Sequence, residues 1–353
     1  MSLQAPDGLG QGGCAAVSGE SEAGSANFYH GGALAAARAR CPDAPEPWID
    51  LSTGINPVPY PVGSIEPDAW ARLPEARDIA ALEQAAAEAY RVRDPASVVA
   101  VPGAQALIQL APALTGARRV GVLGFTYAEH ARCFRRAGAE VQTVERLSEA
   151  DRFDAVVVVN PNNPDGRLLS PDDLLAAAAR MAARGGLLIL DESFIDVLGA
   201  GASVAPRMPE AGLLVMRSFG KTYGLAGLRL GFALAPRRLA ERIRESFGPW
   251  AVSGPAVSIG RRALRDEAWL AKAAERLGRD ARRMDALLQA LGLELLGGCP
   301  LFRLAACEDA RAMFDQLCRR GVLARPFAQR PRWLRFGLPA PECASLLEAR
   351  LGL

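Results

Sequence analysis

Lysine is nearly absent from this 353-residue sequence: only Lys221 and Lys272 are lysines, and the other 39 of its 41 basic residues are arginines. Histidine is equally scarce, with only His30 and His130. Two histidines argue against a zinc site or a serine–histidine triad, so no metal is expected. A chain that uses arginine almost everywhere suggests that its exceptions perform a task unsuited to guanidinium, such as forming a Schiff base through a neutral amine.

The sequence also lacks blocks of like charge, long apolar runs and cysteines in CxxC spacing. Its formal net charge is +2 with the charges mixed along the chain, which argues against nucleic-acid and membrane-surface partners. The longest apolar runs, AVVVV and GLLIL, are too short to span a bilayer, and no secretory signal is found. The seven scattered cysteines predict reduced thiols in a cytoplasmic protein. A small-molecule partner is therefore expected.

Half of the residues are apolar, which is enough for a large core. Residues 1–26 are rich in Gly, Ser and Ala without periodicity and predict a flexible leader. Helical and strand patterns then alternate, which predicts a mainly parallel α/β sheet flanked by helices. A later strand, helix and strand series predicts a smaller α+β domain. After the leader we expect three parts: an N-terminal arm joining the small domain (27–56), a large domain (57–245) and the small C-terminal domain (246–353).

The patterns also predict the individual elements of the large domain. Apolar runs predict strands at 97–101, 118–124, 153–160, 186–190 and 212–216. Helical periodicity predicts helices at 78–90, 104–114, 127–138 and 170–185. The last of these helices begins at Ser170, a residue type that favours the N-cap position.

Three of the predicted strands lead into polar or glycine-rich segments: NPNNPDG (160–166), DESF (191–194) and RSFGKTYGLAGLRLG (217–231). Parallel sheets place ligands outside the carboxyl ends of their strands, so we expect Asn163, Asp191 and Lys221 at one site. Two other lysine motifs fail here. A phosphate loop would need glycine where Val215 stands, and the acyl-transfer pair Ser218-x-x-Lys221 lacks a following Lys-Thr-Gly or Ser-Asp-Asn element.

The charged residues of this site are those that pyridoxal 5'-phosphate requires. Lys221 can supply the Schiff-base amine, and Asp191 can keep the pyridine nitrogen protonated, so that the ring accepts electrons from the substrate Cα. Arg229 and the Ser218 hydroxyl can clamp the phosphate. Backbone N–H groups at a helix start offer a further cradle, at Gly103, Ala104 and Gln105. Each residue taken singly also has a structural explanation, such as a turn, a cap or a core position.

Together the three segments resemble the fold-type I pyridoxal-phosphate enzymes of the class I/II aminotransferase family, over roughly residues 28–345. The resemblance implies that family's transferase-like α/β fold and a homodimer. It assigns Asn163 to the cofactor's 3'-oxygen and stacks Tyr127, in FTYAEH, on the ring. It also implies the roles given above for Asp191, Lys221 and the two phosphate-binding residues.

Within the family the chain resembles the threonine-phosphate decarboxylases of cobalamin biosynthesis, through YHGG, DLSTGINP, DESFID, PWAVSGPA, GVLARPF and LRFGLP. This similarity implies decarboxylation of O-phospho-L-threonine to (R)-1-amino-2-propanol O-2-phosphate. The alternative is an aminotransferase acting on histidinol phosphate or a related phosphorylated amine. A rival of another class is a non-catalytic ligand sensor, but the leader is too short for the helix-turn-helix domain that such regulators carry.

The same resemblance suggests residues for a phosphorylated amino acid. Arg335 matches the family's arginine for the substrate α-carboxylate, and Arg325 is a second cation for a second anionic group. His30 and Asn56 are further candidates for the substrate pocket. The sequence departs from the family at three places: Phe194 replaces a common tyrosine, Leu73 replaces a partner-subunit tyrosine near the phosphate, and Asp165 replaces a threonine. We interpret the change at Asp165 as a feature of its loop.

Overall fold

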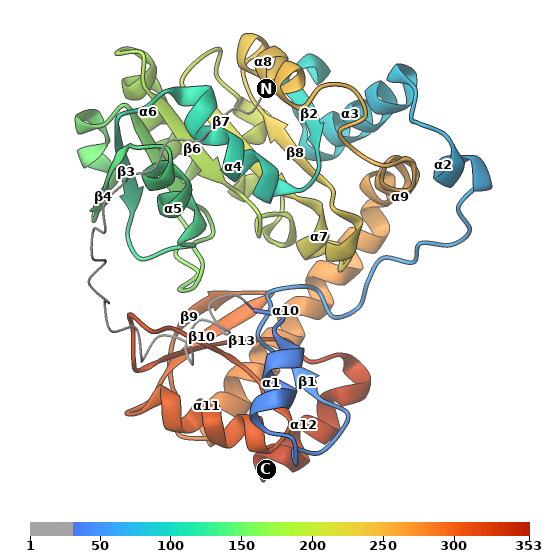
Figure 1. Cartoon of the computed structure of the whole chain (residues 1–353), viewed down its shortest axis with the longest axis vertical. Helices are drawn as coiled ribbons and strands as arrows, with labels where there is room; N and C mark the ends of the chain where they lie inside the picture. Colours follow the sequence, from blue (N-terminus) through green and yellow to red (C-terminus); the bar gives the residue numbers. More distant parts are fainter. Residues whose placement is uncertain (1–30) are drawn as a thin grey trace, which may run out of the picture.

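The computed structural model describes residues 31–353, which form a large and a small lobe (Figure 1). The leader, His30 and Cys14 lie outside the described residues. Within residues 31–353 no helix combines the length and apolar character needed to cross a membrane. The six cysteines of this part of the chain are free, as expected for reduced thiols.

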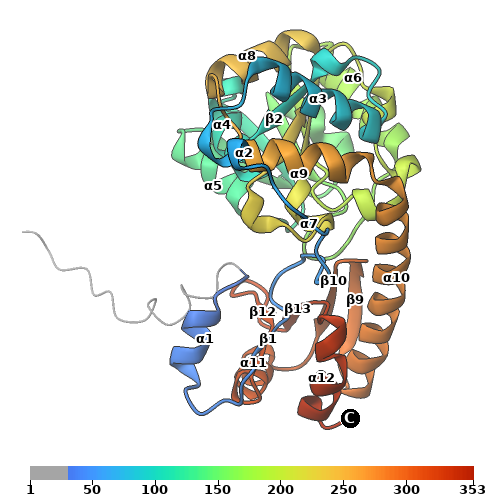
Figure 2. The ribbon, with the colours of Figure 1, turned by 90° about the vertical axis from the view of Figure 1, so that its right-hand side faces the viewer.

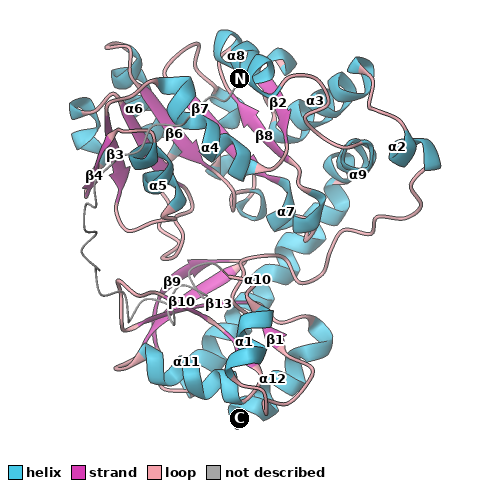
Figure 3. Ribbon diagram, in the orientation of Figure 1, coloured by secondary structure: helices cyan, strands magenta, loops and turns pink. Residues whose placement is uncertain are grey.

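The large lobe is built on a seven-stranded sheet in which β8 alone runs antiparallel to its neighbours. Its strands are, in spatial order, β2 (Val98–Val101), β8 (Gly231–Leu234), β7 (Leu213–Ser218), β6 (Leu187–Asp191), β5 (Ala155–Val159), β3 (Arg119–Leu123) and β4 (Glu140–Val144). All five residues of β5 are buried, because helices cover both faces of the sheet (Figure 3). The predicted mainly parallel α/β fold is confirmed.

The sequence patterns missed β4 and β8. β4 is an edge strand in which only Val144 is buried, so it lacks the apolar run that marks the central strands. β8 has four residues and follows directly on the glycine-rich segment that carries Lys221.

Two apolar layers separate the sheet from its helices. The side chains of one layer come from the sheet and from α3 (Ala76–Tyr90), α6 (Pro171–Ala182) and α9 (Gly254–Arg265). Those of the other come from the sheet and from α4 (Ala104–Thr115), α5 (Glu129–Arg136) and α8 (Arg237–Phe247). The Ser170 hydroxyl caps α6 by accepting a hydrogen bond from the Asp173 amide at 3.1 Å, as predicted. The short helices α2 (Pro67–Ala71) and α7 (Phe219–Thr222) complete this lobe.

The small lobe contains a four-stranded antiparallel sheet and a separate parallel strand pair. The sheet, in spatial order, consists of β12 (Arg325–Pro326), β13 (Trp333–Gly337), β10 (Phe302–Ala306) and β9 (Glu294–Cys299). In the pair, β1 (Ile49–Asp50) from the N-terminal arm lies beside β11 (Val322–Leu323). The helices of the small lobe are α1 (Leu34–Arg40), α11 (Ala310–Arg319) and α12 (Ala344–Leu351). The described part of the arm therefore belongs to this lobe.

The long helix α10 (Glu267–Ala290) connects the lobes (Figure 2). Trp269 in its first turn packs on the large-lobe core, whereas Leu277 and Met284 belong to the small-lobe core. The preceding helix α9 is part of the large-lobe core. The predicted change of domain at residue 246 is therefore too early, because the amphipathic pattern of α9 does not reveal which lobe covers it.

The lobes meet closely where the loop after β5 lies against β9. A Cβ added to Gly166 would come within 2.0 Å of the Gly298 carbonyl oxygen. Gly166 also has a φ of +75°, a conformation that disfavours other residues. This contact allows the two lobes to approach each other beside the loop that carries Asn163.

We expect Gly166→Ala to lower the free energy of unfolding more than Gly185→Ala. Gly185 has nearly the same φ of +74° but nothing within 4 Å of an added Cβ, so it isolates the backbone cost of roughly 1–2 kcal/mol. Overpacking against the Gly298 carbonyl should add about 1–3 kcal/mol at Gly166. Urea denaturation measures both variants, and equal losses would contradict the close lobe contact.

Candidate functional site

A cavity of about 460 Å³ lies at the carboxyl ends of the central strands, facing the small lobe. It is lined by eleven of the predicted site residues: Gly103, Ala104, Gln105, Tyr127, Asn163, Asp191, Ser218, Lys221, Arg229, Arg325 and Arg335. A larger cavity of about 630 Å³ adjoins it and shares Tyr127 and Arg325, but it contains neither the lysine nor the buried aspartate. The smaller cavity is therefore the candidate site.

Lys221 lies on α7, directly after β7, with aromatic side chains on either side of it in the chain. Phe219 and Tyr223 stack at 4.2 Å, and Tyr223 stacks in turn on Trp269 of α10 at 5.5 Å. The Lys221 Nζ is 5.8 Å from the centre of the Phe194 ring. Burial, assisted by the nearby Arg335 charge, lowers the pKa of Lys221 to about 8, although Asp191 opposes this. Far more of this amine is therefore neutral and nucleophilic near neutral pH than of an ordinary lysine, although the ammonium form still predominates at pH 7.

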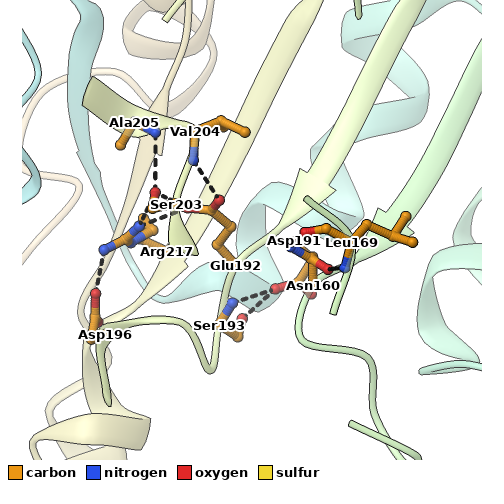
Figure 4. Close-up of polar contacts among 10 residues, drawn as sticks. All are labelled: Asn160, Leu169, Asp191, Glu192, Ser193, Asp196, Ser203, Val204, Ala205 and Arg217. Carbon is orange, nitrogen blue, oxygen red and sulfur yellow. Dashed lines mark hydrogen bonds and ion pairs between the residues drawn. The ribbon is translucent and has the colours of Figure 1, made fainter. Parts of the chain in front are cut away.

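Asp191, the last residue of β6, is buried and holds three hydrogen bonds. Its Oδ1 accepts from the backbone N–H, at 2.9 Å, and from the hydroxyl of Ser193 (Figure 4). Its Oδ2 lies 2.9 Å from His130 Nε2. Burial pushes the pKa of Asp191 upward, but His130 and Ser193 outweigh it and leave the pKa below the usual value. The site thus contains an anionic carboxylate.

The sequence reasoning missed His130 as the partner of Asp191. It is buried near the start of α5, and its ring lies 6.1 Å from that of Tyr127 in a T-shaped contact. Two signals were present: the histidine is one of only two, and it stands three residues after Tyr127.

The expected phosphate cradle is a compact structure around Gly103 and Arg229. Gly103, at the N-cap of α4, has a φ of +84°, and a Cβ there would lie 2.8 Å from Arg229 Nη2. Arg229 itself has a φ of +55°, which is rare outside glycine and is found at functional sites. The backbone conformation of Gly103 therefore favours glycine, and its missing side chain leaves room for the guanidinium beside the first turn of α4. Ser218 also lines the cavity, and its side chain makes no capping bond to α7.

Arg335 reaches the cavity from β13 of the small lobe and is only 3% exposed. Its Nη1 donates to Asn163 Oδ1 at 2.7 Å, and its Nη2 donates to the Ser52 carbonyl at 2.6 Å. Burial and the Arg325 charge hold the pKa of Arg335 well below its ordinary value. Across residues 31–353 its guanidinium has no carboxylate partner. An anion bound in the cavity would compensate this buried charge.

The remaining residues singled out by sequence have other surroundings. Asn56 does not line the cavity: its Nδ2 donates to the Thr222 carbonyl at 2.8 Å and its Oδ1 accepts from Arg276 Nη2 at 2.7 Å. It supports the backbone next to Lys221 instead, which corrects its expected position. Phe194, by contrast, does line the cavity, and its ring packs against Phe302 with ring centres 5.0 Å apart.

Asp165 has the loop role that was expected of it. Its Oδ1 accepts hydrogen bonds from Asn162 Nδ2 at 2.8 Å and from the Arg167 amide at 3.0 Å.

No group of three or more potential metal ligands occurs among the residues that the structure describes. The cavity therefore offers an amine, a buried carboxylate, an anion cradle and extra cations, a set suited to an organic cofactor with an acidic substrate.

Comparison with known proteins agrees with this description. The sequence model of the family "Aminotransferase class I and II" matches residues 48–349. Two relatives named threonine-phosphate decarboxylase are each 43% identical to the chain. The one from a Sinorhizobium species covers 91% of the chain and 96% of its own length, and the one from Pseudomonas aeruginosa covers 89% and 94%.

Solved structures share the fold at lower identity. A histidinol-phosphate aminotransferase from Sinorhizobium meliloti, in complex with pyridoxal 5'-phosphate, has a TM-score of 0.80 at 21% identity and covers 90% of this chain and 93% of its own. An L-threonine-O-3-phosphate decarboxylase from Porphyromonas gingivalis has a TM-score of 0.71 at 21% identity, covering 86% and 98%.

The lowered pKa of Lys221 predicts unusual reactivity in the ligand-free protein. The ammonium form cannot be acylated, so labelling of Lys221 by acetic anhydride should rise with pH around a midpoint of about 8. Mass spectrometry can follow each lysine separately, and Lys272, exposed on α10, is the internal reference.

Arg335→Met should move this midpoint upward, because removing a nearby cation lets the ammonium form persist to higher pH. An unchanged midpoint in this variant, or a wild-type midpoint near the ordinary lysine value of about 10.4, would contradict the described electrostatics.

Proposed function

The chain belongs to the aminotransferase class I and II family, and on that premise we propose that it is a pyridoxal-phosphate-dependent decarboxylase of O-phospho-L-threonine. The product would be (R)-1-amino-2-propanol O-2-phosphate, for cobalamin biosynthesis. The observation that carries the proposal is the buried Arg335, which has no carboxylate partner among residues 31–353 and lies beside a second cavity cation, Arg325. The 43% identity to two threonine-phosphate decarboxylases over most of the chain supports the same activity.

The residues of the cavity fit pyridoxal 5'-phosphate. The cradle between Gly103 and Arg229 suits its phosphate, and the low pKa of Asp191 suits a carboxylate that faces its protonated ring nitrogen. Asn163 would hold the 3'-oxygen, and Tyr127 the ring face. When bound, this cofactor supplies an electron-accepting ring to the carbon that loses its substituent.

The protein's residues would then orient the substrate and manage one proton. Arg335 would hold the α-carboxylate and Arg325 the substrate phosphate, and together they determine which Cα bond is aligned for cleavage. Lys221, in its ammonium form, can return a proton to Cα. Histidinol phosphate, the substrate of the alternative aminotransferase, has no carboxylate for Arg335, whereas the 2-oxoglutarate that accepts its amino group has one. The decarboxylase is the better match because its single substrate supplies both anionic groups, and the 43% identity to two threonine-phosphate decarboxylases favours it.

The test is to incubate the protein and cofactor with O-phospho-L-threonine alone, or with histidinol phosphate and 2-oxoglutarate, and to measure carbon dioxide and glutamate. We expect carbon dioxide from the first mixture without a keto acid. Glutamate from the second, with no carbon dioxide from the first, would overturn the proposal.

Replacing either Arg335 or Arg325 by alanine should reduce kcat/KM about ten- to a hundredfold, because a charge-assisted pair contributes roughly 1.5–3 kcal/mol. Arg311→Ala is the matched control, since this exposed arginine pairs with Asp315 and does not line the candidate site. A similar loss in all three variants would contradict the substrate role.

The proposal includes a homodimer, and the surface of the large lobe supports it. Trp70 is 70% exposed, Leu73 is 63% exposed and Trp250 is 57% exposed. Trp250 lines the same apolar cavity as Pro74, which follows Leu73 directly. Such large exposed apolar side chains are typical of protein–protein interfaces. The free thiols among the described residues suit a cytoplasmic enzyme.

Trp70→Asp and Trp250→Asp should each shift the protein from dimer to monomer, because a carboxylate would be desolvated in the interface. Light scattering coupled to size-exclusion chromatography measures the mass directly. Leu296→Asp, on β9 of the small lobe and 37% exposed, should leave the dimer intact. Wild-type protein that runs as a monomer would refute the dimer.

A further inference from the structure

A buried ionic cluster lies beside the candidate site and takes no part in the chemistry described so far. It consists of Arg217, Glu192, Asp196 and Ser203, here called the Arg217 cluster (Figure 4). Arg217 Nη1 donates to Glu192 Oε2 at 2.7 Å and to Ser203 Oγ at 3.0 Å, and Nη2 donates to Asp196. The three charged side chains are at most 5% exposed.

The cluster lies on the opposite face of the sheet from the cavity residues. Successive residues of a strand point to opposite faces, and Arg217 directly precedes Ser218 as Glu192 directly follows Asp191. The core agrees with this alternation: Val215 packs in the layer of α3, α6 and α9, whereas Met216 packs in the other layer. The Arg217 cluster therefore acts on the site through the backbone rather than by touching a ligand.

Its position coincides with the end of the hydrogen-bonded pairing between β6 and β7. The last paired residues are Asp191 and Met216, and one more backbone bond, from the Glu192 amide to the Met216 carbonyl, measures 2.9 Å. Beyond it β6 ends while β7 continues to Ser218. The Glu192–Arg217 ion pair joins the segments that continue β6 and β7 at the point where the backbone hydrogen bonds between these strands stop.

The cluster also closes the loop that follows β6. Glu192 accepts from the Ser203 hydroxyl at 2.6 Å and from the Val204 amide at 3.2 Å. Asp196 stands two residues after Phe194, whose ring lines the cavity near the Lys221 amine. Arg217 thus holds both ends of the segment that carries Phe194.

Stability alone does not account for this arrangement. Burial raises the pKa of Glu192 and of Asp196 although the Arg217 charge opposes this, so desolvation disfavours the ionised form of each carboxylate. One guanidinium faces two carboxylates, and apolar residues of similar volume are often at least as stabilising as a buried ion cluster. The cluster instead fixes the relative orientation of its groups, because a planar guanidinium that is bonded at both ends can adopt only one orientation.

We propose that Arg217, Glu192 and Asp196 are positioning residues that fix the strand ends carrying Asp191, Phe194 and Lys221 relative to one another. The activity part of this inference rests on the proposed function, whereas the geometric part concerns the chain alone. Loss of one carboxylate should let the loop after β6 move and admit water to the lysine. The expected result is a lower kcat with little change in KM, since the substrate cations belong to other elements.

The experiment compares Glu192→Gln and Asp196→Asn with Glu83→Gln. Glu83 is a buried carboxylate that pairs with Arg244 at 3.0 Å and does not line the candidate cavity, so its variant provides a loss of stability without a contact in the site. Because Glu83 lines the same cavity as Trp250, the mass of this variant is checked by light scattering as well. Ser203→Ala is the milder variant should the charge substitutions prevent folding. Arg217→Lys tests direction, because an ammonium cannot bridge two carboxylates as a planar fork does.

Four measurements are made: the melting temperature, the steady-state kinetics (kcat and KM), the visible circular dichroism of bound pyridoxal 5'-phosphate, and the labelling midpoint of Lys221 in cofactor-free protein. At matched melting temperature we expect the cluster variants to lose about tenfold or more in kcat, to alter the dichroism and to raise the labelling midpoint, with Arg217→Lys behaving in the same way. Glu83→Gln should change none of the last three.

Cluster variants that match Glu83→Gln in kcat, dichroism and labelling would overturn the inference. Failure of the proposed function has a different signature: borohydride reduction of the wild type would leave no pyridoxyl group on Lys221, or O-phospho-L-threonine would release no carbon dioxide. The labelling midpoints would still test the positioning role in that case, because they need neither cofactor nor substrate.

Discussion

The parallel pairing of β6 with β7 is the contact on which the candidate site depends. It places Asp191 opposite Met216 and so brings the carboxylate and the strand leading to Lys221 to the same edge of the sheet. Parallel strands expose their carboxyl ends together, which is why ligands bind there. The cavity, its buried carboxylate and its lysine all follow from this register.

Burial then turns ordinary side chains into chemically useful ones. The pKa of Lys221 falls to about 8 because its ammonium is desolvated and faces Arg335, while the pKa of Asp191 stays low because His130 and Ser193 compensate its burial. The same low-dielectric surroundings thus favour the neutral amine of Lys221 but leave Asp191 a charged carboxylate. The difference arises from hydrogen-bond partners, which Asp191 has and which the Lys221 amine lacks among residues 31–353.

The two lobes contribute different parts of the site. The large lobe provides the lysine, the aspartate and the anion cradle, and the small lobe provides Arg325 and Arg335. The hydrogen bond from Arg335 to Asn163 crosses between them, next to the glycine contact of Gly166 with Gly298. Substrate recognition therefore depends on how the lobes are placed, whereas the lysine and the carboxylate both belong to the large lobe, where the paired strands β6 and β7 end.

The sequence alone determined the alternating α/β pattern, the three segments after the strands and the roles suggested for Lys221, Asp191 and Arg229, because strand periodicity and motif spacing are properties of short stretches. Only the tertiary structure decided the rest. His130 meets Asp191 across 61 residues, Arg335 meets Asn163 across 172, and Asn56 bonds the Thr222 carbonyl and does not line the cavity. The antiparallel direction of β8 and the inclusion of α9 in the large lobe were likewise not visible in their own residues. Such contacts join segments far apart in the chain, and packing rather than local pattern selects which of many buried polar groups become partners.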